Sequence, residues 1–213
     1  MTRHTDDLEP AKRIVLTFDI CSSTAILEDL LGTENIGAWR DFLIWMKQLL
    51  ITESREYNFE IYKFTGDGWV LLYPEDCSGG QLFECIEHFS DKVRQKLATT
   101  ILPLLNVHPH VTGLTFGLDR GTLVSVVMMG RTEYVGRALN MAARLQSAIK
   151  DRDKQPQYKV MLTKHLYRMF RADLQSYRCD SVERTLRNVA GEQPVHCVKV
   201  WLKCRPQAAP KKR

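Results

Sequence analysis

The sequence predicts an α/β (α+β) domain in which β-strands and amphipathic helices alternate. The apolar, branched run from Ile14 to Phe18 is typical of a buried strand. Two further apolar runs flank Gly66-Asp67-Gly68, and two glycines at a turn favour a β-hairpin. Segments 39–50 and 81–101 carry apolar residues at three- and four-residue intervals, as helices with one buried face do. A chain of 213 residues can bury such a core as one domain.

The first predicted strand ends at Asp19, and small residues form the turn that follows it. Cys21, Ser22, Ser23 and Thr24 leave room for an anion to approach the backbone N–H groups at a helix start. An acidic residue beside such a turn suits a metal ion that carries a phosphate group. A simple helix cap uses the same residue types, so this motif alone leaves both interpretations open.

A second acidic residue, Asp67, lies in the predicted hairpin of residues 58–73. A Gly-Asp-Gly turn is commonly structural, but here it follows Asp19 by one helical region, residues 24–55, which is broken near Gly32-Thr33. Two carboxylates on adjacent strands can hold divalent cations, which activate an oxygen atom and neutralise a polyphosphate. The pair therefore predicts a metal-dependent site for phosphate chemistry.

The remaining elements are predicted in the order helix 81–101, connector 102–110, strand 111–118, strand 122–128, helix 137–149, strand 158–162, helix 164–170 and two strands, the last near 195–202. Gly121 is expected at a turn between the two central strands. Asn140 and Arg144 are four residues apart and share one helix face, where they are either surface decoration or site residues.

Bulk properties limit the classes of partner. Much of the net charge of +5 comes from residues 203–213, so it is weak evidence for nucleic-acid binding, and no nucleic acid is expected. No apolar run approaches the ~20 residues that span a bilayer, so no membrane contact is expected. The six cysteines show neither metal-type spacing nor a disulfide framework, which favours a cytoplasmic setting. We expect a flexible N-terminus at 1–11, one domain at 12–202 and a basic, disordered tail at 203–213.

Three segments carry a family resemblance. In order and spacing, FDICSST, KFTGDG, and GLDRG followed by EYVGRALNMAARL resemble the class III nucleotidyl cyclase catalytic domain over roughly residues 12–202. The resemblance implies a ferredoxin-like domain with a central, mostly antiparallel sheet flanked by helices, assembled as a head-to-tail homodimer. A short stand-alone cyclase is most similar to the pyrimidine cyclases of bacterial anti-phage (Pycsar) defence, and among them to uridylate cyclases.

By this resemblance, the ribose 3′-oxygen attacks the α-phosphorus of a nucleoside triphosphate and gives a 3′,5′-cyclic nucleotide and diphosphate. Asp19, Asp67 and the carbonyl of Ile20 are expected to hold two Mn²⁺ or Mg²⁺ ions per site. Asn140 is expected to orient the ribose, and Arg144 to stabilise charge on the α-phosphate. The two pairs come from different chains in the family, which is why a homodimer with two equivalent sites is expected.

Substrate contacts are implied for several more positions. These are Phe18, Cys21, Ser22, Ser23 and Thr24 at the first strand and turn, and Arg187, where the family often has Leu-Lys-Gly in place of Leu186-Arg187-Asn188.

Lys63 and Glu133 match the two base-reading positions of the family. A lysine donor and a carboxylate acceptor suit uracil O4 and N3–H, and they also suit adenine N1 and its 6-amino group. The residues therefore permit uracil or adenine, and only the whole-chain resemblance favours UTP. A downstream effector that senses the cyclic nucleotide is expected to read the product without direct contact with this chain.

Three alternatives remain open at this point. One is an adenylate cyclase that converts ATP to cAMP, and another is a catalytically inactive, cyclase-like dimerisation module. The third is a diguanylate cyclase, but the chain lacks the GGDEF signature of that family.

Overall fold

The structure, a computed structural model, describes residues 10–189, 191 and 193–203. The tail 204–213 and residues 1–9 of the predicted N-terminus lie outside the described residues. The elements are β1 (Pro10–Ile20), α1 (Ser23–Gly32), α2 (Ile36–Glu56), β2 (Glu60–Phe64), β3 (Gly68–Pro74), α3 (Gly79–Thr100), the short 3₁₀ helix η1 (Leu102–Leu104), β4 (Leu114–Met128), β5 (Arg131–Val135), α4 (Arg137–Ser147), β6 (Lys159–Thr163), α5 (Lys164–Met169), β7 (Arg178–Thr185) and β8 (Pro194–Trp201).

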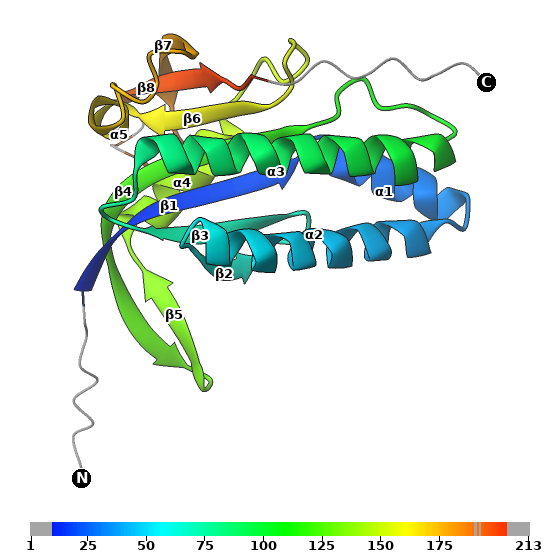
Figure 1. The fold of residues 1–213 in the computed structure, drawn as a ribbon, viewed down its shortest axis with the longest axis horizontal. Coiled ribbons are helices and arrows are strands. Elements are labelled where there is room, and N and C mark those ends of the chain that lie inside the picture. The colour runs from blue at the N-terminus through cyan, green and yellow to red at the C-terminus, as the bar shows by residue number, and fades with distance from the viewer. Residues whose placement is uncertain (1–9, 190, 192, 204–213) are drawn as a thin grey trace.

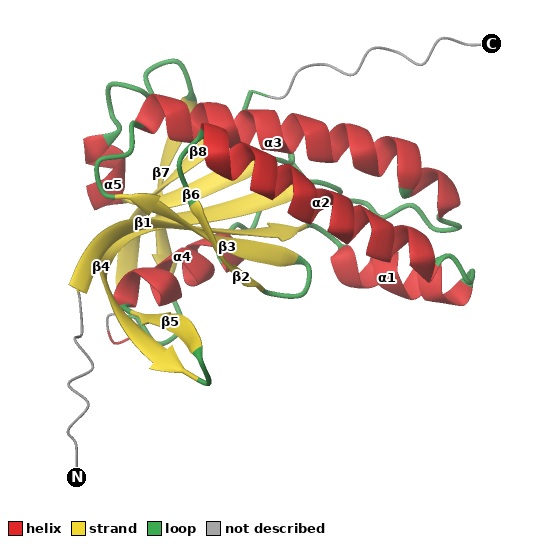
Figure 2. Ribbon diagram, turned by 60° about the horizontal axis from the view of Figure 1, so that its bottom comes forward, coloured by secondary structure: helices red, strands yellow, loops and turns green. Residues whose placement is uncertain are grey.

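The described strands form one eight-stranded sheet in the order β2-β3-β1-β4-β6-β8-β7, with β5 paired to the far end of β4. The pairing of β4 with β6 is parallel, and the other strand pairings are antiparallel. Helices α2 and α3 cover one face of this sheet and α4 covers the other (Figures 1 and 2). The predicted α+β class and the mostly antiparallel sheet are therefore confirmed.

Strand β1 lies between β3 and β4 and is buried on both faces. Ile14, Leu16 and Phe18 pack into the main core, whereas Val15 belongs to the smaller cluster that faces α4. Successive side chains of a strand point to opposite faces, which explains why consecutive residues from Ile14 to Leu16 are apolar. The strand begins at Pro10, which pairs with Val124, so it starts two residues before the predicted domain boundary.

The predicted turn at Gly121 is wrong. Strand β4 runs without interruption through this position, where Gly121 pairs with Arg13 of β1. The glycines of β4 instead permit the close approach of α4. A Cβ atom at Gly117 would lie 1.9 Å from the carbonyl oxygen of Ala142, and one at Gly121 would lie 3.1 Å from the Cβ of Ala138.

The second half of β4 and β5 form a hairpin arm that projects from the body of the molecule (Figure 1). From the sequence, no element was predicted between the strand 122–128 and the helix 137–149, so β5 was not predicted. The arm exposes Val127, Met128, Met129 and Val135. Exposed apolar surface of this kind is typical of protein contact sites.

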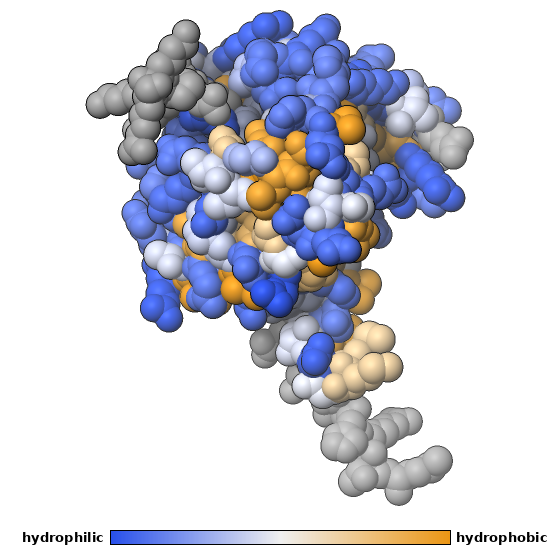
Figure 3. Space-filling model, turned by 90° about the vertical axis from the view of Figure 1, so that its right-hand side faces the viewer, coloured by the Kyte–Doolittle hydropathy of each residue, from blue (hydrophilic) through white to orange (hydrophobic). Residues whose placement is uncertain are grey.

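A second apolar surface lies beside α2. A groove of about 670 Å³ runs between α2 and the β2–β3 hairpin, and its lining includes Trp39, Ile44 and Phe64. Apolar residues also gather on the side of the molecule that lies at the right of Figure 1 (Figure 3). Among the described residues, no helix combines the length and hydrophobicity needed to cross a membrane.

The contact between α4 and β4 gives a testable prediction. Gly117→Ala should lower the free energy of unfolding by about 1–3 kcal/mol, because its new methyl group meets backbone atoms that must move. Chemical denaturation followed by circular dichroism measures this change. Gly37→Ala in α2 is the matched control: it meets no atom within 4 Å and should be neutral or mildly stabilising. Equal stability of the two variants would contradict the close packing of α4.

Candidate active site

The structure brings the carboxylates of Asp19 and Asp67 into contact. Asp19 pairs with Gly68 in the register of β1 and β3, and the backbone N–H of Ile20 donates to the carbonyl of Asp67 at 3.3 Å. A Cβ atom at Gly68 would lie 1.9 Å from the carbonyl oxygen of Phe18, so only glycine lets the hairpin turn lie this close to β1. Gly66 has a different role in the turn: its φ is 109°, a backbone conformation that residues with a side chain rarely adopt.

The crowding of these two acids changes their chemistry. Burial, a hydrogen bond with Asp67 and the negative charge of Asp67 together raise the pKa of Asp19 from 3.8 to about 7. A cation bound between the two carboxylates would relieve this repulsion. The donor set fits a divalent cation that also takes oxygen ligands from a substrate, because the protein itself offers two carboxylates at this point. Among the described residues, no group of three or more His, Cys, Asp and Glu side chains is arranged to hold a metal.

The turn after β1 presents the start of α1 to this pair. The hydroxyl of Ser23 donates to Oδ2 of Asp67, and Ser22 adopts a left-handed conformation with φ of 60°. The first intrahelical hydrogen bond runs from Ile26 N to the carbonyl of Ser22 at 3.0 Å. The N–H groups of Ser23 and Thr24 therefore precede the helical ladder, as an anion-binding helix start requires.

Two of the implied substrate contacts need correction. The backbone N–H of Cys21 donates to the carbonyl of Gly113 at 2.9 Å and its thiol is buried, so neither group is free for a phosphate. The side chain of Phe18 is 1% exposed and packs between Trp69 and Phe116 in the core. A hydrophobic residue in a central strand is more often core than ligand, and here burial decides it.

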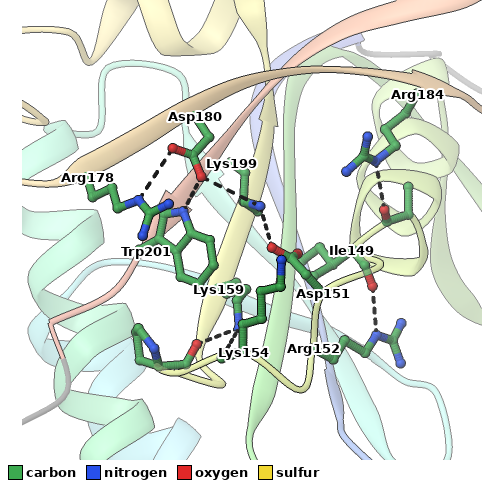
Figure 4. A network of polar contacts seen from close by, with 12 residues as sticks. Ile149, Asp151, Arg152, Lys154, Lys159, Arg178, Asp180, Arg184, Lys199 and Trp201 are labelled. Carbon is green, nitrogen blue, oxygen red and sulfur yellow. Dashed lines mark hydrogen bonds and ion pairs between the residues drawn. The ribbon is translucent and has the colours of Figure 1, made fainter.

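Arg152, which was not predicted as a site residue, lies in the segment between α4 and β6. Its positive charge opposes the upward pKa shift of Asp19 and also acts on the thiol of Cys21, so its guanidinium lies near the candidate site. Its Nε donates to the carbonyl of Ile149 at 3.1 Å (Figure 4). Residues 150–154 lie between the predicted helix 137–149 and the predicted strand 158–162, where no site residue was expected.

Buried charged residues hold that segment in place. Lys199 donates to Asp151 at 2.5 Å, and Lys159 donates to the carbonyls of Lys154 and Pro156 (Figure 4). Lys159 and Lys199 are 0% and 6% exposed, and the ammonium group of each also lies over the ring of Trp201. Because buried charges are costly unless paired, these contacts fix the conformation of the segment next to Arg152.

The two base-reading candidates also meet. The ammonium of Lys63 lies 3.3 Å from Oε2 of Glu133, and the hydroxyl of Tyr62 donates to the same oxygen at 2.6 Å. These hydrogen bonds, first that of Tyr62 and then that of Lys63, lower the pKa of Glu133. Tyr62 was not predicted as a site residue, because nothing in a single sequence indicates that its side chain reaches β5.

Asn140 and Arg144 do not join the Asp19–Asp67 pair within the chain. Ala138 and Ala142 face the sheet, and each polar residue follows one of these alanines by two positions, which is about 200° around a helix. Both side chains are exposed, and neither forms a hydrogen bond or ion pair with another described residue. They therefore point away from the sheet that carries Asp19.

Arg187 lies in the described segment after β7 and is exposed. The neighbouring Leu186 is 2% exposed and packs with Leu145 and Met161 beneath α4. Arg187 thus lies near α4, and a phosphate-binding role for it stays a prediction.

No protein-family model matches the chain, and no curated protein matches it either. Solved structures do match. The adenylyl cyclase CyaB from P. aeruginosa shares 17% identity over 94% of this chain and 100% of its own, with a TM-score of 0.63. The guanylyl cyclase Cya2 shares 16% identity over 96% of both chains, with a TM-score of 0.62.

An adenylate/guanylate cyclase/hydrolase from Silicibacter pomeroyi shares 17% identity, with a TM-score of 0.60, over 94% of this chain and 99% of its own. Each alignment covers more than nine-tenths of both chains. At these identities the comparison concerns the arrangement of elements. The chain has the fold of adenylyl and guanylyl cyclase domains.

Proposed function

We propose that this chain is a nucleotidyl cyclase that converts a nucleoside triphosphate, preferentially UTP, into the 3′,5′-cyclic nucleotide and diphosphate. The observation that carries the proposal is the contact of Asp19 with Asp67 beside a helix start, within a fold shared with adenylyl and guanylyl cyclases. Crowded carboxylates cost stability, and such strain is typical of functional sites.

The residues of one chain supply the phosphate end of this site. Two Mn²⁺ or Mg²⁺ ions, when bound by Asp19, Asp67 and the Ile20 carbonyl, would activate the 3′-hydroxyl and neutralise phosphate charge. The N–H groups of Ser23 and Thr24 bind phosphate oxygens at the start of α1. Ser23 also orients Asp67 through its hydroxyl.

A second copy of the chain supplies the other end. Asn140 and Arg144 face away from the Asp pair of their own chain, so a head-to-tail homodimer is the arrangement in which both pairs reach one substrate. Asn140 orients the ribose, Arg144 stabilises charge on the α-phosphate, and Arg187 contributes a further phosphate contact. The exposed apolar arm and the groove beside α2 provide surface for such an assembly.

The base preference rests on a different argument. The Lys63–Glu133 pair offers a donor beside an acceptor, which suits uracil and also adenine. UTP is proposed because the chain as a whole resembles the uridylate cyclases of anti-phage defence. In that role the cyclic nucleotide is a second messenger, which diffuses to an effector that does not touch this chain.

The reaction is tested by its products. The purified chain, incubated with Mn²⁺ and each of ATP, GTP, CTP and UTP, should form cyclic UMP as its main product, identified by chromatography with mass spectrometry. Asp67→Asn is the control and should lose at least about 100-fold in rate, because it removes a metal-binding charge. Cyclic AMP as the main product would select an adenylate cyclase. The absence of product from every triphosphate would select an inactive, cyclase-like module.

Sharing of the site between two copies gives a second prediction. Asp19→Ala and Arg144→Ala should each be inactive as homodimers, with a rate loss of about 10²–10³ for the arginine. Mixed in equal amounts, they should regain about a quarter of the wild-type rate, since half of the dimers are mixed and each mixed dimer has one intact site. A lack of rescue, with mixed dimers demonstrated by native mass spectrometry, would exclude shared sites.

The raised pKa of Asp19 gives a third prediction. Folding raises the pKa of Asp19 from its ordinary value of 3.8 to about 7, so the folded state holds the proton more tightly and unfolding releases it between pH ~4 and ~7. Stability in EDTA therefore falls as pH rises through this range. Asp19→Asn lacks this loss, and its melting temperature should exceed that of the wild type at pH 8, with the difference vanishing toward pH 4.

Mn²⁺ completes this test. At pH 8 it should raise the melting temperature of the wild type and leave that of Asp19→Asn unchanged, because only the wild type keeps both carboxylates. Asp41→Asn, an exposed surface carboxylate in α2, is the control and should behave as the wild type does in both buffers. A wild-type melting temperature independent of pH and of Mn²⁺ would contradict the paired-carboxylate site.

A further inference from the structure

We propose that a β-bulge at Tyr62 builds the base-recognition cluster, in which Tyr62 is a positioning residue that aims the Glu133 carboxylate at the nucleobase. The inference deepens the proposed function and rests on it, since a base is recognised only if a nucleotide binds. It adds to the Lys63–Glu133 pair a third residue that sets the direction of the acceptor.

The bulge is visible in the strand register. Ile61 pairs with Leu71, but Lys63 pairs with Val70, so Tyr62 is an extra residue in β2. Adjacent residues in a regular strand point to opposite faces of the sheet. Tyr62 and Lys63 nevertheless both reach Oε2 of Glu133, at 2.6 Å and 3.3 Å. Bulges re-aim side chains in this way and are common next to functional sites.

Tyr62 itself is held from two sides. Its hydroxyl oxygen accepts from the backbone N–H of Tyr134 at 3.0 Å, and the two tyrosine rings lie 5.1 Å apart at 75°. The ring also packs against the apolar cluster that includes Leu72 and Leu123. A phenol has a single O–H to donate, and this geometry commits it to Glu133. The position of the carboxylate is therefore set by the packed ring and not by the mobile chain of Lys63.

The contacts leave a defined set of groups for a ligand. Among the described residues, the hydrogen bonds to Glu133 all end on Oε2, so Oε1 keeps its acceptor capacity. Tyr62 and Lys63 lower the pKa of Glu133 and so favour its ionised form, and an ionised carboxylate only accepts hydrogen bonds. Lys63 keeps two further N–H groups. The cluster thus selects a base edge with an N–H beside an acceptor atom. Tyr62 sets the angle at which the Glu133 carboxylate meets that edge.

The same cluster is tied to α4. Tyr62 and Tyr134 pack against the buried group that contains Ala138 and Ala142, the residues through which α4 lies on the sheet. The base-recognition cluster therefore packs against α4 of the same chain, the helix that carries Asn140 and Arg144. A change at Tyr62 should alter base selection more than the chemical step.

Tyr62→Phe tests this role because it removes the hydroxyl and keeps the ring. For the preferred triphosphate, KM should rise about 10-fold, the loss expected for one hydrogen bond to a charged group, while kcat changes little. The ratio of kcat/KM between the preferred and the other triphosphates should fall by a similar factor. Tyr134→Phe is the matched control: it loses a hydroxyl that donates to Glu60 at 3.3 Å but keeps the backbone N–H, and its base preference should match that of the wild type.

A merely structural strap between β2 and β5 would give a different result. Tyr62→Phe would then lower the melting temperature and leave the ratios of kcat/KM unchanged, which overturns the inference while the proposed function stands. An equal loss of preference in Tyr134→Phe would also overturn it. If the wild type cyclises no triphosphate, the proposed function fails, and calorimetry with the four α,β-methylene triphosphate analogues decides the inference. Selective binding that Tyr62→Phe weakens supports it, and binding that is absent, unselective or unchanged in the variant overturns it.

Discussion

The structure depends on how closely the β2–β3 hairpin turn lies against the end of β1. Gly68 is the residue that permits this approach, because any side chain there would collide with the backbone of Phe18. The approach brings Asp19 and Asp67 together, raises the pKa of Asp19 and gives the hydroxyl of Ser23 an acceptor. Two like charges held side by side are unfavourable for folding, and the apolar core on both faces of β1 stabilises the arrangement that contains them.

A second close approach, between α4 and the glycines of β4, arranges the rest of the candidate site. Gly117 and Gly121 let the helix backbone lie directly on the sheet, which fixes the rotation of α4 about its axis. With its alanines on the sheet, α4 turns Asn140 and Arg144 outward. The acidic pair lies at the end of β1 and the outward pair lies on the exposed face of α4, and the proposed two-copy site rests on this separation.

Two further residues, Arg152 and Tyr62, lie close to residues that are far from them in sequence, so their positions could not be predicted from the sequence. Arg152 lies beside Asp19 because Lys159 and Lys199, both buried, hold the segment after α4 through backbone carbonyls and Asp151. Tyr62 reaches Glu133 because one extra residue in β2 alters the direction of its neighbours. Hydrogen bonds to neighbouring residues therefore hold both the segment after α4 and the extra residue in β2 in fixed conformations.

The sequence by itself determined the alternation of strands and helices, the hairpin with Asp67 in its turn, and the break between α1 and α2, since hydrophobic periodicity and glycine chemistry are local properties. It also pointed to the Asp19–Asp67 pair, and the family resemblance pointed to Lys63 and Glu133; the structure brings the members of each pair together. Tertiary structure alone decided that Gly121 lies inside a continuous strand, that Phe18 and Cys21 are buried and that β5 forms an arm. It also decided that Tyr62 lies beside Glu133 and Arg152 near Asp19. These outcomes depend on which segments pack against each other. The sequence cannot distinguish a glycine that allows a helix to pack closely against a strand from a glycine that forms a turn.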